Sequence, residues 1–173
     1  NLSLKIEALE INEVEVSAEK LNRKNNIQPS RVNLSPRIIK AAPALAEPDI
    51  FRTIQALPGV LTNNEASTGL VIRGGNTDQN LILLDGITVY NPTHFGGIFS
   101  NFIVDAVKEA ELIKGGYNAE YGGRLSAVLN VLSREGNRNY FQGKTSISLL
   151  SAQTTMEGPF YKGAWLLSAR RTY

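Results

Sequence analysis

Two stretches decide the fold: VIRGGNTDQNLILLDGITVYNPTHFGG, residues 71–97, and VKEAELIKGGYNAEYGGRLSAVLNVLSREGN, residues 107–137. In both stretches, short apolar runs of strand length end repeatedly in paired glycines, which mark tight turns. The charged residues stand at the ends of these runs and do not gather into one cluster. This pattern predicts a small sheet with tight connections, and it does not favour an enzyme active site.

Local signals define the expected elements. Asp49 can cap a short helix of about two turns, which starts at Ile50 with apolar residues at helical spacing and ends before Pro58. The pair Asp85-Gly86 is a tight hairpin signal between two strands. We expect strands over 70–73, 81–84, 87–89, 109–114 and 127–133, and helical turns over 100–107, capped by Ser100, and over 117–121. The expected fold class is α+β, a small mixed sheet with short helices.

Four sequence blocks, taken in order, resemble the plug domain of TonB-dependent outer-membrane receptors. The blocks are LPGV at 57–60, VIRGG at 71–75, LILLDGITV at 81–89, and the run from AELIKGG at 110–116 through AEYGG at 119–123 to LNVLS at 129–133. The form with KGGYNAEYGG is similar to Bacteroidetes-type receptors that carry an N-terminal carboxypeptidase-regulatory-like domain. It lacks the pattern typical of the glycan-importing branch, which pairs with a surface lipoprotein.

The residues before these blocks suggest a division of the chain. Residues 1–18 contain an alternation of apolar and polar side chains that is typical of a half-exposed strand. The resemblance implies that they hold the end of a preceding domain and a TonB-box-like strand. Residues 19–46 lose this period and contain three prolines, which predicts a linker before a plug domain at 47–136.

Residues 137–173 differ from the rest of the chain. Two strand-like runs, 144–158 and 163–173, are joined by PFYKG at 159–163 and carry aromatic residues near their ends. Ten-residue strands, short turns and aromatic girdles are typical of outer-membrane barrels. We therefore predict that 137–173 holds the first two strands of a transmembrane β-barrel, with an ordinary exposed hairpin as the alternative.

Composition excludes several classes of protein. The 173 residues are 42% apolar and 20% charged, and they carry 18 basic against 16 acidic side chains without a block of like charges. These values fit a folded domain and do not predict nucleic-acid binding. No stretch has the roughly 18 apolar residues that a membrane-spanning helix needs. The resemblance implies a signal peptide upstream and a barrel downstream of this chain, and a complete cytosolic domain is the alternative.

Catalysis and metal binding are not expected. There is no cysteine, and the one histidine, His94, has no acidic pair at ligand spacing. The stretch Gly143-Lys144-Thr145 lacks the preceding glycine of a phosphate-binding loop, and no Gly-x-Ser-x-Gly stretch occurs. We predict no enzyme activity, no metal and no cofactor.

Two cations are candidates for holding a plug inside a barrel. Arg73 and Lys114 both stand at strand ends beside glycine. The resemblance puts them at the two positions through which plugs of the family face carboxylates on the inner barrel wall. Such pairs hold well while both partners are present, since a buried charge left alone costs several kcal/mol. Solvated strand-end charges are the alternative.

Residues 90–99, YNPTHFGGIF, are expected to form the outward-facing apex of the plug. Their proline and glycines are expected to prevent regular structure and to leave the aromatic side chains clustered. Aromatic rings give contact area at low entropic cost. We therefore predict a substrate-binding floor made by Tyr90, Asn91, His94 and Phe95. The alternative is that the rings pack inward against the sheet.

The expected function is the gate of an active importer. The plug would occlude a barrel of about 22 strands and couple uptake of a small nutrient or siderophore to the TonB C-terminal domain. The TonB-binding residues would be Glu13, Val14, Glu15, Val16 and Ser17, which suit addition as a strand. The expected location is the outer membrane, with the N-terminal segment in the periplasm. A non-energised binding or scaffold module of an outer-membrane complex and a soluble enzyme domain are the alternatives.

Overall fold

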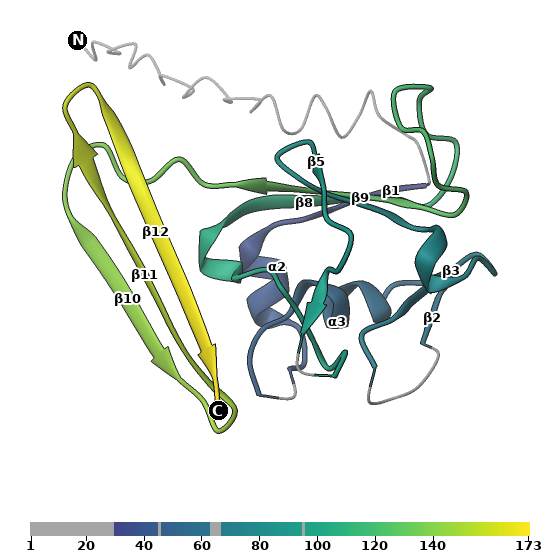
Figure 1. Ribbon diagram of the computed structural model, residues 1–173, viewed down its shortest axis with the longest axis horizontal. Helices are drawn as coiled ribbons and strands as arrows, with labels where there is room; N and C mark the ends of the chain where they lie inside the picture. The colour runs from purple at the N-terminus through teal and green to yellow at the C-terminus, as the bar shows by residue number, and fades with distance from the viewer. Residues whose placement is uncertain (1–29, 45, 63–66, 95) are drawn as a thin grey trace, which may run out of the picture.

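The structure is a computed structural model that describes residues 30–44, 46–62, 67–94 and 96–173. Helices α2 and α3 lie on one side of a sheet in the main body, and the last three strands form a separate sheet at one end (Figure 1). The elements are β1 Arg31–Leu34, α2 Pro36–Ala41, α3 Ile50–Gln55, β2 Val60–Thr62, β3 Leu70–Ile72, η1 Thr77–Gln79, β4 Leu81–Leu84, β5 Ile87–Thr88, β6 Thr93–His94, β7 Phe99–Ser100, η2 Val104–Ala106, β8 Val107–Ile113, β9 Val128–Ser133, β10 Gln142–Ile147, β11 Ser151–Phe160 and β12 Gly163–Thr172.

The main body, residues 31–134, is organised around a mixed sheet of five strands in the order β1-β8-β9-β4-β5. Strands β4 and β9 run parallel, and the other neighbours in this sheet are antiparallel. Two smaller two-stranded sheets, β2-β3 and β6-β7, flank it. The predicted mixed sheet with short helices is therefore confirmed for the described part of the chain.

Side-chain alternation gives the five-stranded sheet two apolar faces. On β4, Ile82 joins the main core, whereas Leu81 and Leu83 join a smaller cluster on the opposite face. The main core is completed by the two helices, with Ile39 of α2 and Phe51 of α3 both buried. The smaller cluster is covered by two partly buried tyrosines, Tyr117 and Tyr121.

The helix predicted after Asp49 is confirmed. Asp49 Oδ1 accepts hydrogen bonds from the backbone N–H groups of Phe51, at 2.8 Å, and Arg52, at 3.1 Å. These are free donors at the start of the helix, so the side chain stabilises it there. Helix α3 ends at Gln55, before the Pro-Gly pair at 58–59.

The Asp85-Gly86 hairpin is also confirmed. Both residues adopt left-handed backbone conformations, with φ of 49° and 81°, as a tight turn between β4 and β5 requires. Asp85 Oδ1 accepts a hydrogen bond from the backbone N–H of Ser133 at 2.8 Å, and this bond holds the pKa of Asp85 below its ordinary value. The turn is thereby tied to the end of β9.

The range 19–46 is not irregular where the structure describes it. Strand β1 and helix α2 lie inside this range, and β1 pairs with β8. Pro36 occupies the first turn of α2, where its missing N–H is not needed, and Pro43 follows the helix end. Two of the three prolines that suggested a linker therefore mark the start and stop of a helix, and Pro29 lies outside the described residues.

Two shorter predictions are wrong. Ser100 lies in β7 and caps no helix, and the only helical turn in 100–107 is η2, which starts at Val104. Residues 117–121 form a turn, with a hydrogen bond from the Tyr121 N–H to the Asn118 carbonyl, rather than a helix. At Ser100 the pairing with β6 outweighs the local helical signal. At residues 117–121 the flanking glycines disfavour a helix.

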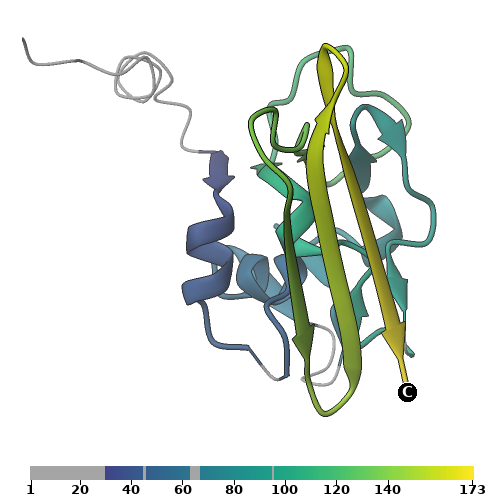
Figure 2. The ribbon, with the colours of Figure 1, turned by 90° about the vertical axis from the view of Figure 1, so that its left-hand side faces the viewer.

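The C-terminal part forms three strands where two were predicted. The run 144–158 is interrupted at residues 148–150, where Ser148 Oγ accepts hydrogen bonds from the backbone N–H groups of Leu150 and Ser151. A serine side chain of this kind competes with the strand ladder and closes a turn. Figure 2 shows the resulting sheet β10-β11-β12, here called the terminal sheet, lying across one end of the main body. Among the described residues, no helix has the length and apolar character needed to cross a membrane.

Candidate functional site

The contact between the main body and the terminal sheet, here called the seam, contains the most deeply buried ion pair among the described residues. Glu47 Oε1 lies 2.9 Å from Arg170 Nη1, and the two side chains are only 5% and 9% exposed. The second carboxylate oxygen, Oε2, accepts a hydrogen bond from Ser151 Oγ at 2.5 Å. Glu47 precedes the Asp49 cap by two residues, so the start of α3 positions it.

Arg170 also binds the β6-β7 hairpin. Its Nη2 donates to the Ser100 carbonyl at 2.6 Å and lies 3.2 Å from His94 Nδ1. Because the guanidinium can only donate, Nδ1 is the acceptor in the neutral ring, and Nε2–H then donates to Thr172 Oγ1 at 3.2 Å. Two residues of β12 are thereby held by one hairpin of the main body.

Asp49 fixes the main-body side of this network. While its Oδ1 caps α3, its Oδ2 accepts the backbone N–H of Ser100 at 2.7 Å. Ser100 therefore donates its N–H to Asp49 and offers its carbonyl to Arg170. Helix α3, strand β7 and strand β12 are joined through the two backbone polar groups of one residue.

Two further ion pairs cross the seam with alternating polarity. Arg134, just after β9, lies 2.5 Å from Glu157 of β11, and Asp105 of η2 lies 2.9 Å from Lys144 of β10. Together with Glu47–Arg170, the main body contributes two acids and one base, and the terminal sheet contributes two bases and one acid. Such complementary order penalises a shifted register, because like charges would then meet.

Asp105 is less exposed than the two lysines that it contacts. It contacts Lys40 of α2 as well as Lys144, and its side chain is 11% exposed. Burial alone would raise the pKa of Asp105, but the hydrogen bonds from Lys40 and Lys144 outweigh it and hold the pKa below its ordinary value. Asp105 therefore remains charged at neutral pH.

The structure places the Arg73 guanidinium beside Gly115, the residue that follows Lys114. Arg73, after β3, is exposed and has φ of 50°, and its Nη1 would lie 3.0 Å from a Cβ placed on Gly115. Lys114, after β8, is 9% exposed, and its Nζ donates to the Pro58 carbonyl at 2.9 Å. Neither makes an ion pair within the described residues. Both strand ends lie at the far end of the main body from the terminal sheet (Figure 1).

The proposed substrate residues are not brought together as one floor. Tyr90 is 84% exposed, and Asn91 is exposed with its carbonyl accepting from Asn101 Nδ2 at 2.6 Å. His94 points into the seam. Residues 90–99 are not irregular, since they contain the β6-β7 hairpin, and Phe99 is buried in the main body. Phe95 and the TonB-binding candidates Glu13 to Ser17 lie outside the described residues.

The residues of the seam were not predicted from the sequence. The available signal was the alternation along two strands, since most residues of β11 and β12 that face the main body are polar, Leu166 being an exception, and several on the other side are apolar. The facing residues include Ser151, Thr155, Glu157, Ser168, Arg170 and Thr172. The partners on the main body, Glu47, Asp105 and Arg134, carry no local signal, because each is defined by a contact across the chain.

Comparison with known proteins agrees with the fold. Residues 23–128 match the model of the TonB-dependent Receptor Plug Domain family. The TonB-dependent transporter Oar of Myxococcus xanthus is 31% identical over 86 residues, which are 50% of this chain and 8% of that protein. The chain therefore belongs to the family of TonB-dependent receptor plug domains, which is not an enzyme family, and it is a component of an outer-membrane transporter.

Solved structures share the fold at low sequence identity. The siderophore receptor PirA from Pseudomonas aeruginosa is similar with a TM-score of 0.59 and 21% identity, covering 84% of this chain and 29% of that chain. The alcaligin outer-membrane receptor FauA from Bordetella pertussis is similar with a TM-score of 0.56 and 16% identity, covering 82% of this chain and 26% of that chain. The chain thus spans less than a third of the length of these relatives.

Breaking the buried pair should cost far more than breaking an exposed one. Glu47→Gln leaves Arg170 buried without its counter-charge, so we expect a loss of about 3–5 kcal/mol in the free energy of unfolding. The pair Glu135–Arg138, whose side chains are 72% and 66% exposed, is the matched control. Glu135→Gln should cost less than about 1 kcal/mol. Urea unfolding of each variant measures both losses.

The double variant Glu47→Gln with Arg170→Gln completes the cycle. Because no charge is then left buried alone, it should be more stable than the sum of the two single losses predicts. Additive losses would contradict a direct interaction across the seam and would leave Glu47 and Arg170 as separate structural contacts.

Stability should fall in acid partly through Asp105. The pKa of Asp105 is lower in the folded protein than its ordinary value of 3.8. The contribution of Asp105 to the free energy of unfolding is therefore complete above pH 3.8 and is lost as the pH falls through the pKa of the folded protein. Asp105→Asn should flatten the decline of the urea midpoint between about pH 5 and pH 2. Asp78→Asn, at an exposed acid without an ion pair among the described residues, should leave the decline unchanged. Equal curves for wild type and Asp105→Asn would contradict this role.

Proposed function

We propose that this chain is the gate of an active importer and that the terminal sheet is the beginning of the barrel around it. The observation that carries the proposal is the Glu47–Arg170 pair, a buried charge pair between the main body and a strand of the terminal sheet, in which both carboxylate oxygens and both Nη atoms have partners. An ordinary surface hairpin has no need to bury an arginine against a domain. A plug that must seat in one position needs such a contact.

The distribution of side chains on the terminal sheet supports the barrel proposal. The side that faces the main body is mostly polar, with Leu166 among its polar residues, and the other side exposes Ile147, Met156 and Leu167, at 77%, 49% and 64%. Polar residues inside and apolar residues outside are the reverse of a soluble sheet and are typical of outer-membrane strands. The aromatic residues Phe160 and Tyr161, near the tight turn between β11 and β12, are also exposed.

We propose that Arg73 and Lys114 form a second latch at the opposite end of the main body. Two neighbouring cations that lack an acidic partner among the described residues suit carboxylates supplied by another part of the barrel wall. Lys114 is buried with one carbonyl as its partner, which leaves its charge only partly compensated. The seam would then hold the plug on one side and these cations on the other.

Energy for import would come through TonB, and residues 13–17 would be its binding segment. The alternation of EVEVS suits addition as a strand to a sheet of TonB. We further propose the branch of receptors with an N-terminal carboxypeptidase-regulatory-like domain, on the form KGGYNAEYGG. The residues proposed to face the incoming substrate before the plug moves are Tyr90, Asn91, His94 and Phe95. His94 would leave the seam when it contacts the substrate.

A non-energised binding or scaffold module is the second candidate function. It shares the plug fold and the buried seam and differs only in having no TonB-driven movement. Uptake that persists in cells without TonB would favour this candidate.

The gate proposal predicts ion leakage when the latches are broken. In planar bilayers, the full receptor that contains this chain should conduct little, and the double reversal Arg73→Glu with Lys114→Glu should raise its conductance. Glu47→Gln should do the same, since each change leaves charges unpaired in a confined site. Arg138→Glu, at an exposed position outside both latches, is the control. Unchanged conductance in both latch variants would reject the gate.

TonB binding should depend on the backbone of residues 13–17. Val16→Pro removes one N–H donor from the added strand and should reduce affinity for the TonB C-terminal domain at least tenfold. Asn25→Pro, outside the segment, should have no effect. Equal affinities of both variants in a titration by calorimetry would show that TonB binds elsewhere.

A further inference from the structure

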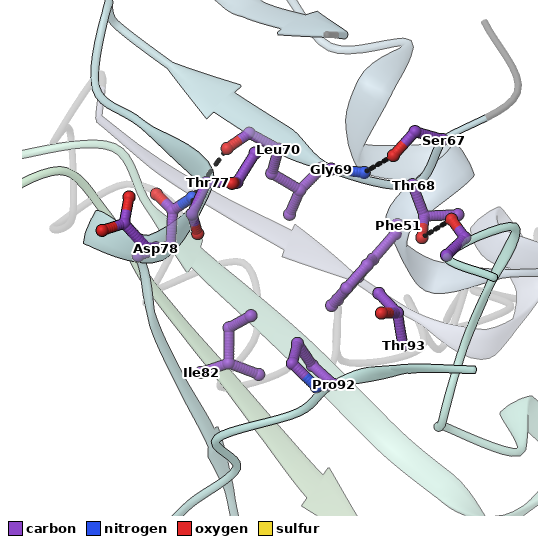
Figure 3. A pocket seen from close by; sticks show the side chains of 12 residues that line it. Phe51, Ser67, Thr68, Gly69, Leu70, Thr77, Asp78, Ile82, Pro92 and Thr93 are labelled. Carbon is purple, nitrogen blue, oxygen red and sulfur yellow. Dashed lines mark hydrogen bonds between the residues drawn. The ribbon is translucent and has the colours of Figure 1, made fainter. Parts of the chain in front are cut away.

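A cavity of about 310 Å³ opens on the main body, and none of the residues of the seam ion pairs lines it. Helix α3, the strands β3, β4 and β6, and η1 all contribute to its lining. Figure 3 shows the side chains of Phe51, Leu70, Ile82 and Pro92 around a common space. Phe51, Leu70 and Ile82 belong to the core and are at most 6% exposed, so they form an apolar floor, and Pro92, just before β6, stands beside it. The space suits about ten water-sized groups, in the range of small-ligand sites.

The polar groups of the cavity are uncharged, apart from one carboxylate at its edge. The hydroxyls of Thr77 and Thr93 make no hydrogen bond within the described residues, and Figure 3 shows the Thr93 hydroxyl near Phe51 and Pro92. Asn80 is held by its Nδ2, which donates to the Leu70 carbonyl at 2.7 Å. Its Oδ1 is buried without a partner among the described residues, which leaves an acceptor unused.

The charges around the cavity select against an anion. None of the described residues that line it is Lys, Arg or His, so no cation would compensate an acidic ligand. The one charged lining residue is Asp78, whose carboxylate points away from the cavity in Figure 3. An anion would lose its hydration without a cationic partner among the lining residues. A cation would find no charge directed at it inside.

We propose that this cavity is a binding site for a small uncharged solute that has an apolar body and one or two hydroxyl or amide groups. The apolar wall would cover the body of the solute, and the free hydroxyls of Thr77 and Thr93 would fix its polar group. The proposal rests on the plug function, since a solute must reach the plug through the receptor. It gives the receptor a ligand class that differs from anionic metal chelates.

Three probes with one ring and different head groups test the class. Benzyl alcohol, benzylammonium and benzoate are added in turn to the full receptor in detergent, and saturation-transfer NMR reports contact with each. Thr77→Trp should fill the cavity, so its signal reports only probe bound elsewhere, including probe in the detergent. Subtracting it from the wild-type signal leaves the part that comes from the cavity. Thr62→Trp, at an exposed position of β2 outside the cavity, is the matched control.

Benzyl alcohol should give a difference signal at least fivefold stronger than either charged probe. Thr93→Val keeps the shape and removes one hydroxyl, so it should weaken benzyl alcohol binding about three- to tenfold, as the loss of one hydrogen bond implies. Benzoate binding as strongly as benzyl alcohol would overturn the ligand class, and identical signals from wild type and Thr77→Trp would overturn the site. Neither result requires TonB or conductance, so both are separate from a failure of the gate.

Discussion

The seam depends on one constraint: the side chains of Glu47 and Arg170 must be desolvated together. Each charge is almost fully buried, and each depends on the other for compensation. Nη2 of Arg170 is bound by the β6-β7 hairpin, so the terminal sheet cannot slide without breaking several bonds at once. Asp49 keeps Ser100 in place for this contact. The weaker, more exposed pairs at Asp105 and Arg134 then add order rather than strength.

The parts of the fold that were predictable from sequence are those set by neighbours along the chain. A carboxylate two residues ahead of a free N–H caps a helix wherever it stands, and Asp85-Gly86 turns a strand wherever two left-handed residues are needed. The strands β3, β4, β8 and β9 follow from apolar runs between glycines. Residues 31–41 were missed because a four-residue strand has no period of its own, and it becomes a strand only by pairing with β8.

The candidate site was less predictable because it is made by distant partners. Glu47 and Arg170 are 123 residues apart, and nothing near either position requires the other. His94 was proposed from a loop that looked irregular, yet the same residue closes a hairpin and contacts β12. Arg73 and Lys114, by contrast, were proposed through resemblance, and the described residues supply no acidic partner for either of them. The cavity had no sequence signal, since its wall comes from five elements.

The order of elements along the chain sets how far a pull on the N-terminal segment travels before it meets the seam. Strand β1 is an edge strand with one partner, and only the short helix α2 separates it from Glu47. Drawn out fully, the 17 residues from Arg31 to Glu47 span at most roughly 60 Å. A force that draws out these residues from the N-terminal side reaches Glu47 of the buried ion pair while the parallel pairing of β4 with β9 is still intact. The seam is thus placed early on the mechanical path, even though it lies at the far end of the fold in space.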